Sequence, residues 1–151
     1  MTAGMRERPA IPRAAAVAKA VEAAAILSRD PRVRLVYLFG SAADPEARTV
    51  RDVDLAVLLD PPATFDELLR LRADLVEATG APLDLVSLHR APIVLAHEIA
   101  ETGRCLHARP PESETEFVVG ARARYWDWKP FLDQQWRALG ERLEERRGPA
   151  A

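Results

Sequence analysis

Two aspartates stand where carboxylates are costly unless a positive charge compensates them. Asp52 and Asp54 are separated by one residue and lead into the apolar run Leu55–Leu59, so in a strand both side chains lie on one face. Neighbouring carboxylates repel each other, and a divalent ion with a preference for oxygen ligands, such as Mg²⁺, relieves that repulsion. Because a lone Asp-x-Asp is more often a solvated strand end, the interpretation depends on other residues of the chain.

Two further features favour a phosphate and metal site. Gly40-Ser41 ends an apolar stretch; glycine lets the backbone approach a ligand, and the serine hydroxyl and free N–H groups can hold phosphate oxygens. The same pair also favours a plain turn. Asp84 interrupts the apolar run Leu83–Leu88. If it shares a face with the first two aspartates, three carboxylates can hold two Mg²⁺ ions, and Asp84 is the candidate base for an attacking hydroxyl.

Predicted helices and strands surround these residues. Thr64, Glu67 and Gly80 are typical of a capped helix. The patterns predict helices at 13–27, 64–79, 92–102 and from 112 to about 145, and strands at 32–39, 53–59, 83–88 and 105–107. This order predicts a mixed α/β (α+β) domain with a small sheet.

The C-terminal segment has its own pattern. Apolar residues recur at spacings of three, four, four, three and four, at Tyr125, Trp128, Leu132, Trp136, Leu139 and Leu143. They form one stripe on a long helix, which Pro130 should kink or split near Trp128. The stripe either packs on the sheet as core or docks a partner, and the pattern does not decide between the two.

Composition limits the possible functions. The chain has 151 residues, 48% of them hydrophobic, which suits one domain: a flexible arm at 1–12, a core at 13–110, a helical segment of the same domain at 111–145 and a frayed tail at 146–151. A net charge of -2 is unlike the basic excess of general nucleic-acid binders. A single cysteine excludes a disulfide framework. No apolar run is long enough for a membrane span, so we expect a cytoplasmic location.

The Gly-Ser pair, the ten-residue spacer 42–51, Asp-x-Asp and the later aspartate resemble the DNA-polymerase-β-like nucleotidyltransferase superfamily. The spacer and the length look like those of its minimal nucleotidyltransferase (MNT) branch, as do the segments 90–92, 103–106 and 125–128. The resemblance covers nearly the whole chain. It implies the polymerase-β-like fold and transfer of AMP from ATP to a tyrosine of a partner toxin of the HEPN class, an all-helical ribonuclease. The chain would then be an adenylyltransferase antitoxin.

The resemblance also implies roles for individual residues. Gly40 and Ser41 would contact the triphosphate, Asp52 and Asp54 would bind both Mg²⁺ ions, and Asp84 would bind the catalytic ion and help activate the acceptor hydroxyl. Attack on the α-phosphate would release pyrophosphate. The chain departs from the family pattern at Ala43-Asp44-Pro45, where many members have Arg and Gly, and at Arg51, where a serine is frequent. These departures concern nucleotide affinity rather than the metal ligands.

Other functions remain open from the sequence. The chain could be an antitoxin that acts by contact alone, or a small-molecule nucleotidyltransferase, although only one helical segment is left to form an acceptor-binding domain. A nucleic-acid polymerase is disfavoured because no basic channel is evident. Arg90 and His97 match the loose Arg–His pattern of HEPN ribonucleases, but we reject that match because the pair follows a predicted strand.

Overall fold

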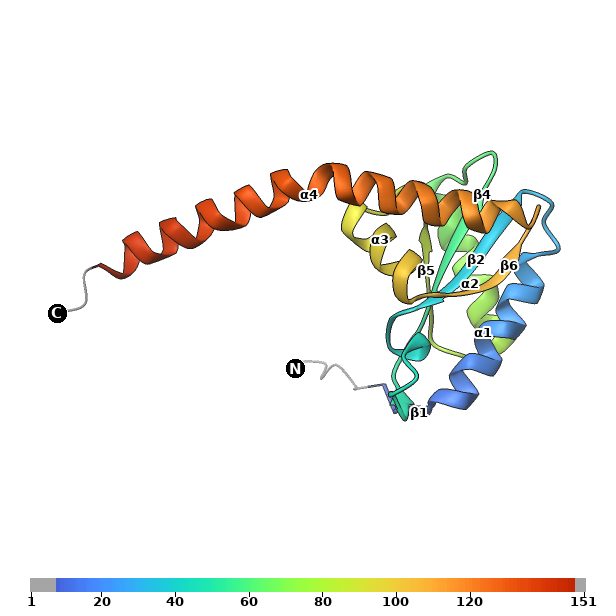
Figure 1. Cartoon of the computed structure of the whole chain (residues 1–151). Coiled ribbons are helices and arrows are strands. Elements are labelled where there is room, and N and C mark those ends of the chain that lie inside the picture. The colour runs from blue at the N-terminus through green and yellow to red at the C-terminus, as the bar shows by residue number, and fades with distance from the viewer. Residues whose placement is uncertain (1–7, 149–151) are drawn as a thin grey trace.

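A four-stranded sheet with helices on both faces forms the body of the molecule in the computed structural model, which describes residues 8–148 (Figure 1). The strands are β1 (Ile11–Pro12), β2 (Val33–Phe39), β3 (Thr49–Val50), β4 (Val53–Leu59), β5 (Leu83–Ser87) and β6 (Arg104–Ala108). The helices are α1 (Arg13–Leu27), the 3-10 turn η1 (Gly40–Ala43), α2 (Phe65–Thr79), α3 (Ile93–Thr102) and α4 (Glu112–Arg147). The predicted fold class is confirmed.

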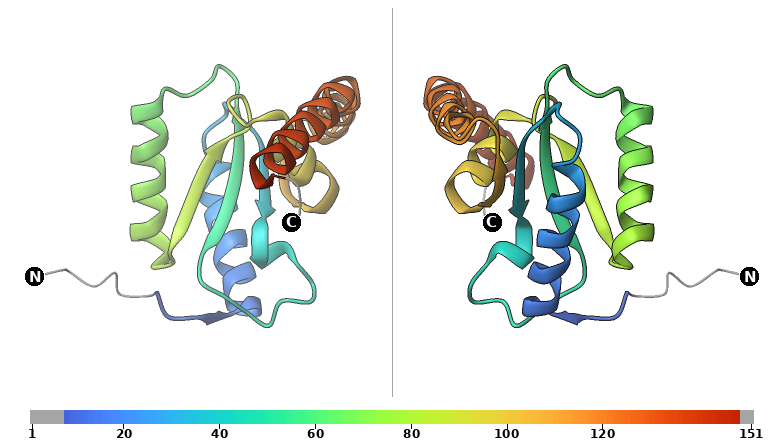
Figure 2. Two further views of the ribbon diagram at one scale, coloured as in Figure 1. Left: turned by 90° about the vertical axis from the view of Figure 1, so that its left-hand side faces the viewer. Right: turned by 90° about the vertical axis from the view of Figure 1, so that its right-hand side faces the viewer.

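The main sheet has the strand order β5-β4-β2-β6. β2 runs antiparallel to both β4 and β6, whereas β4 and β5 are parallel. Helices α1 and α2 cover one face of the sheet, and α3 and the first part of α4 cover the other (Figure 2). Each face has its own buried cluster, so the two central strands are apolar on both sides.

Local sequence signals explain the boundaries of α2. The Thr64 hydroxyl accepts a hydrogen bond from the Glu67 N–H at 3.2 Å, and the Glu67 carboxylate accepts one from the Thr64 N–H at 3.3 Å. This capping box satisfies two N–H groups that would otherwise lack partners. Gly80 ends the helix at φ +68, a left-handed conformation that glycine adopts without strain. The predicted caps are confirmed.

Regular structure extends into both of the predicted terminal segments within the described residues. Part of the predicted flexible arm forms β1, because Ile11 pairs with Val50 and the Arg13 N–H donates to the carbonyl of Arg48 at 2.9 Å. Residues 1–7 of that arm lie outside the described residues. At the other end the helix continues through Arg147, so the start of the predicted tail is helical; residues 149–151 are not described.

Helix α4 changes its surroundings along its length. Its first turns pack on the sheet through Phe117 and Ala121, and Tyr125 stacks on His97 of α3 with 3.7 Å between ring centroids. The helix is continuous through Pro130 rather than split, and α4 bends along its length (Figure 1). A proline inside a helix favours a bend because it removes one hydrogen bond and clashes with the preceding turn.

Beyond the bend, the helix projects from the body (Figure 1). Three members of the predicted stripe, Trp136, Leu139 and Leu143, are between 43% and 62% exposed. This part of the stripe is therefore not core. Within residues 8–148, no helix has the length and apolar character needed to cross a membrane.

Candidate active site

The strand register brings two of the predicted carboxylates side by side. Asp54 of β4 and Asp84 of β5 are Cα partners in the parallel pair. Leu83 and Leu85 on either side of Asp84 are buried, so Asp84 projects from the opposite face and is exposed. The sequence alone did not determine this pairing. A register shifted by one residue would place Asp84 on the other face from Asp54.

Asp54 is half-buried and lies near two other carboxylates. Burial raises the pKa of Asp54 above its ordinary value, and the negative charges of Asp84 and Asp52 raise it further. Burial is the largest cause because a charged carboxylate loses water contacts there. Asp54 is therefore the residue whose charged form would gain most from a nearby cation.

The other two carboxylates, those of Asp52 and Asp84, each form an ion pair with an arginine. Arg8 forms an ion pair with Asp52. The Arg72 guanidinium of α2 lies 3.1 Å from Oδ1 of Asp84, and its Nε donates to the carbonyl of Leu83 at 2.9 Å. Neither arginine was predicted. They lie 44 and 12 residues from their partners, and no local signal in the sequence identifies such contacts.

The arginines bear on how the site could hold a metal ion. Among residues 8–148, no three His, Cys, Asp or Glu side chains gather as a ready metal cluster. The aspartates nevertheless supply oxygen-only donors of the kind that Mg²⁺ prefers. Burial and two neighbouring negative charges disfavour the charged form of Asp54 and raise its pKa. The donor set fits a divalent cation once Asp52 and Asp84 turn away from their arginines, which are exposed partners.

Gly40 places the turn after β2 directly against Asp54. Its φ is +70, and a Cβ at this position would lie 2.5 Å from Oδ2 of Asp54, so both backbone conformation and space require glycine. Ser41 is exposed and lines a cavity of about 390 Å³ together with Asp52 and Asp54. The structure thus places the predicted phosphate-binding turn beside the predicted metal ligands.

The departures from the family pattern lie at the rim of this site. The Asp44 carboxylate is exposed and accepts a hydrogen bond from the Glu46 N–H at 2.9 Å. This bond stabilises the turn, as Asp side chains commonly do. Arg51 lines the cavity beside Ser41 and adds a positive charge there.

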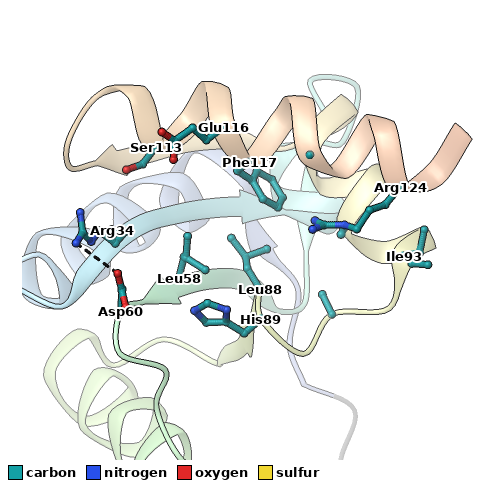
Figure 3. Close-up of a pocket in the computed structure, with 13 residues that line it drawn as sticks. Arg34, Leu58, Asp60, Leu88, His89, Ile93, Ser113, Glu116, Phe117 and Arg124 are labelled. Carbon is teal, nitrogen blue, oxygen red and sulfur yellow. Dashed lines mark hydrogen bonds and ion pairs between the residues drawn. The ribbon is translucent and has the colours of Figure 1, made fainter. Parts of the chain in front are cut away.

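A larger cavity lies away from the carboxylates. It has a volume of about 660 Å³ and lies between α4 and the loop after β5, with Arg124 pointing into it and an Arg34–Asp60 ion pair at 3.4 Å on its rim (Figure 3). Arg34 is near the start of β2, whereas Gly40 follows its end, so this cavity is at the opposite end of the sheet. Its lining includes the carboxylates of Asp60, which pairs with Arg34, and of Glu116, and we assign no metal chemistry to it.

The mixed sheet, the Gly-Ser turn and the three aspartates are the features of a nucleotidyltransferase, and comparison with known families gives the same class. The family described as "Polymerase beta, Nucleotidyltransferase" matches residues 22–112, which include Gly40, Ser41 and all three aspartates. The chain therefore belongs to the polymerase β nucleotidyltransferase family.

Individual relatives are more specific. The chain is 33% identical over 97 residues to the protein adenylyltransferase MntA of Shewanella oneidensis, which is 63% of this chain and 68% of that protein. It resembles a chain in a crystal structure of a toxin–antitoxin complex with AMP-PNP, with a TM-score of 0.65 and 25% identity over 77% of this chain and 98% of that one. A structure of a tri-AMPylated HEPN toxin with an MNT antitoxin, from Shewanella oneidensis, gives a TM-score of 0.61 and 25% identity over 78% and 98% of the two chains.

Proposed function

We propose that this chain is a Mg²⁺-dependent adenylyltransferase that transfers AMP from ATP to a tyrosine of a HEPN toxin and thereby acts as its antitoxin. The observation that carries the proposal is the register that sets Asp54 beside Asp84 and next to the Gly40-Ser41 turn. Its similarity to a protein adenylyltransferase and to antitoxins in complexes with AMP-PNP or an AMPylated toxin supports the choice of nucleotide and acceptor. Because ATP is the substrate, we place the activity in the cytoplasm.

Each residue has a separate task in this reaction. The backbone at Gly40 and the hydroxyl of Ser41 hold the triphosphate. Asp52 and Asp54 would hold two Mg²⁺ ions, with Asp84 as a further ligand of the catalytic ion, and ions held there would supply positive charge that favours deprotonation of the acceptor and neutralises the pyrophosphate. Asp84 also orients the tyrosine hydroxyl and receives its proton. A bond forms from the tyrosine oxygen to the α-phosphorus as the bond from that phosphorus to pyrophosphate breaks.

Nucleotide and acceptor reach the carboxylates from different sides. The cavity with Ser41 and Arg51 borders Asp52 and Asp54 and suits the triphosphate. A second groove, of about 560 Å³, runs between the N-terminal segment and the end of α2, with Arg72 on its wall. Since Arg72 contacts Asp84, we assign this groove to the acceptor. Separate cavities for the two substrates allow the carboxylates to bind both at once.

Intact-mass spectrometry of the toxin tests the proposal. Toxin incubated with this chain, Mg²⁺ and ATP should gain the mass of one or more AMP units, and peptide mapping should place them on tyrosine. Asp54→Asn should lower the rate by at least about 100-fold, because it removes the central ligand. Asp127→Asn, which changes an exposed carboxylate of α4, should leave the rate unchanged.

Removal of the metal provides a separate check. EDTA should abolish transfer, and added Mg²⁺ should restore it. Wild-type chain that neutralises the toxin without any gain in mass would instead support an antitoxin that acts by contact alone. Full activity in Asp54→Asn would show that the site is assigned wrongly.

A further inference from the structure

The last part of α4 is a helix without a surface to pack on. We call residues 130–147 the projecting arm; at 1.5 Å per residue its 18 residues extend about 27 Å. Such a short helix has little stability in water on its own, and this one contains a proline and a glycine. Its exposed side chains include Phe131, Trp136, Leu139 and Leu143. Gathered apolar side chains of this kind mark interaction sites.

These side chains lie on one face of the arm. With about 100° per residue, Phe131, Leu132, Trp136, Leu139 and Leu143 fall within about 140° of the helix surface. Several of them line an open groove along the arm. We call these five residues, together with Arg142 and Arg146, the docking face. The matched family segment ends at residue 112, so the docking face lies beyond it.

Charge is distributed unequally around the arm. Arg142 and Arg146 lie within the angular range of the apolar residues, whereas the four acidic residues of the arm lie outside it, at Asp133, Glu141, Glu144 and Glu145. Within the described residues no carboxylate forms an ion pair with Arg142 or Arg146. The docking face therefore presents apolar surface with positive charge and no negative charge.

We infer that the docking face binds a protein partner that presents an apolar groove bordered by carboxylates. An amphipathic helix laid into such a groove is a common form of protein recognition, and tryptophan and arginine are frequent energetic centres of interfaces. This inference rests on the proposed function for the identity of the partner, which is the HEPN toxin. The arm then holds the toxin while the carboxylates modify it.

Two other occupants fit the charges less well. A second copy of the chain would bring the two arginine-bearing faces together without an acidic group between them. A lipid surface favours helices with a strongly basic polar face, but the arm has four basic and four acidic residues and no net charge. Charge complementarity favours the acidic protein groove.

Calorimetric titration of the purified toxin into the full-length chain tests the inference. Leu139→Glu should weaken binding at least tenfold, because it places a carboxylate in the apolar face. Arg142→Glu should weaken binding several-fold and reduce its dependence on salt. Glu144→Arg, a charge reversal of equal size on the opposite side of the arm, is the matched control and should change the dissociation constant less than twofold. All three residues are exposed, so circular dichroism should show unchanged folding.

The outcomes separate the inference from the proposed function. Equal binding of wild type and Leu139→Glu would overturn the docking face even if AMP transfer is intact. Loss of binding in Leu139→Glu, together with no AMP transfer by wild type, would retain the docking face and remove the enzyme function. A wild-type dimer in sedimentation velocity, or binding to vesicles of anionic lipid, that Leu139→Glu abolishes would also overturn the inference.

Discussion

The two parts of α4 belong to one continuous helix but have different surroundings. Phe117, in the first part, is 8% exposed and contacts the Tyr37 ring with 5.3 Å between centroids, whereas Phe131, in the projecting arm, is 54% exposed. The first part therefore contributes to the stability of the domain, and the second does not. A long helix with one amphipathic pattern can thus be core at one end and binding surface at the other.

Shortening the two phenylalanines should produce the largest difference. Phe117→Ala leaves a cavity in the buried cluster and should reduce the free energy of unfolding by about 3–5 kcal/mol. Phe131→Ala should change it by about 0.5 kcal/mol or less, as exposed substitutions generally do. Urea unfolding followed by circular dichroism measures both. Similar losses would mean that the arm packs on the body in solution.

A pair of glycines extends the comparison to the active site. Gly40→Ala forces a Cβ against Asp54 at positive φ and should cost about 1–3 kcal/mol of stability, with loss of AMP transfer. Gly140→Ala in the arm meets open space and should increase helix content, since alanine is favoured over glycine by about 1 kcal/mol in a helix. Chemical denaturation and far-ultraviolet circular dichroism report these effects. Equal destabilisation by both would contradict the geometry of the turn.

A smaller effect is expected from the charge on Asp54. Its raised pKa means that, without divalent metal, the folded chain binds this proton more tightly than the unfolded chain does. The free energy of unfolding should therefore fall as pH rises from about the ordinary value of 3.8 through the raised pKa. Asp54→Asn should unfold at a higher temperature than wild type at pH 7 in EDTA, and the difference should vanish at low pH. A lower temperature at pH 7 would show that the carboxylate is not destabilising.

The smallest change should follow removal of the whole arm. A chain that ends at Lys129 should keep the free energy of unfolding of the full chain to within about 0.5 kcal/mol. It should also retain binding of ATP, because the cavity beside Ser41 contains no arm residue. Differential scanning fluorimetry and a nucleotide titration test this. A large loss of stability would place the arm within the cooperative domain.

Much of the fold was predictable because its signals are local. The bounds of α1 and β4 agree with the periodicity and turn residues of the sequence, and α2 has its predicted capping box. The two-residue strands β1 and β3 were missed, since so short a pair has no periodicity and forms only when distant segments meet. The surroundings of the C-terminal stripe were also not predictable, because an apolar pattern does not show whether it packs on its own domain or on another protein.

The candidate site also has a part that the sequence predicts and a part that depends on the fold. Residue type, spacing and the family resemblance made Gly40, Ser41 and the aspartates the candidates, and Asp84 stood out as a polar residue in an apolar strand. Its position beside Asp54 depends on strand pairing, which a sequence does not fix. The arginines at positions 8 and 72 were missed for the same reason, because each reaches its aspartate only in the folded chain.

The arginine partners of Asp52 and Asp84 also affect whether the domain needs an ion in order to fold. Two of the three negative charges are already balanced within the chain, so the domain can fold before it meets any ion. An arriving cation must then compete with guanidinium groups for the carboxylate oxygens. Exposed ion pairs of this kind are worth about 1 kcal/mol or less each, which a doubly charged ion can replace more readily than a singly charged one. If the site holds a metal as proposed, this competition for paired carboxylates would favour divalent over monovalent ions.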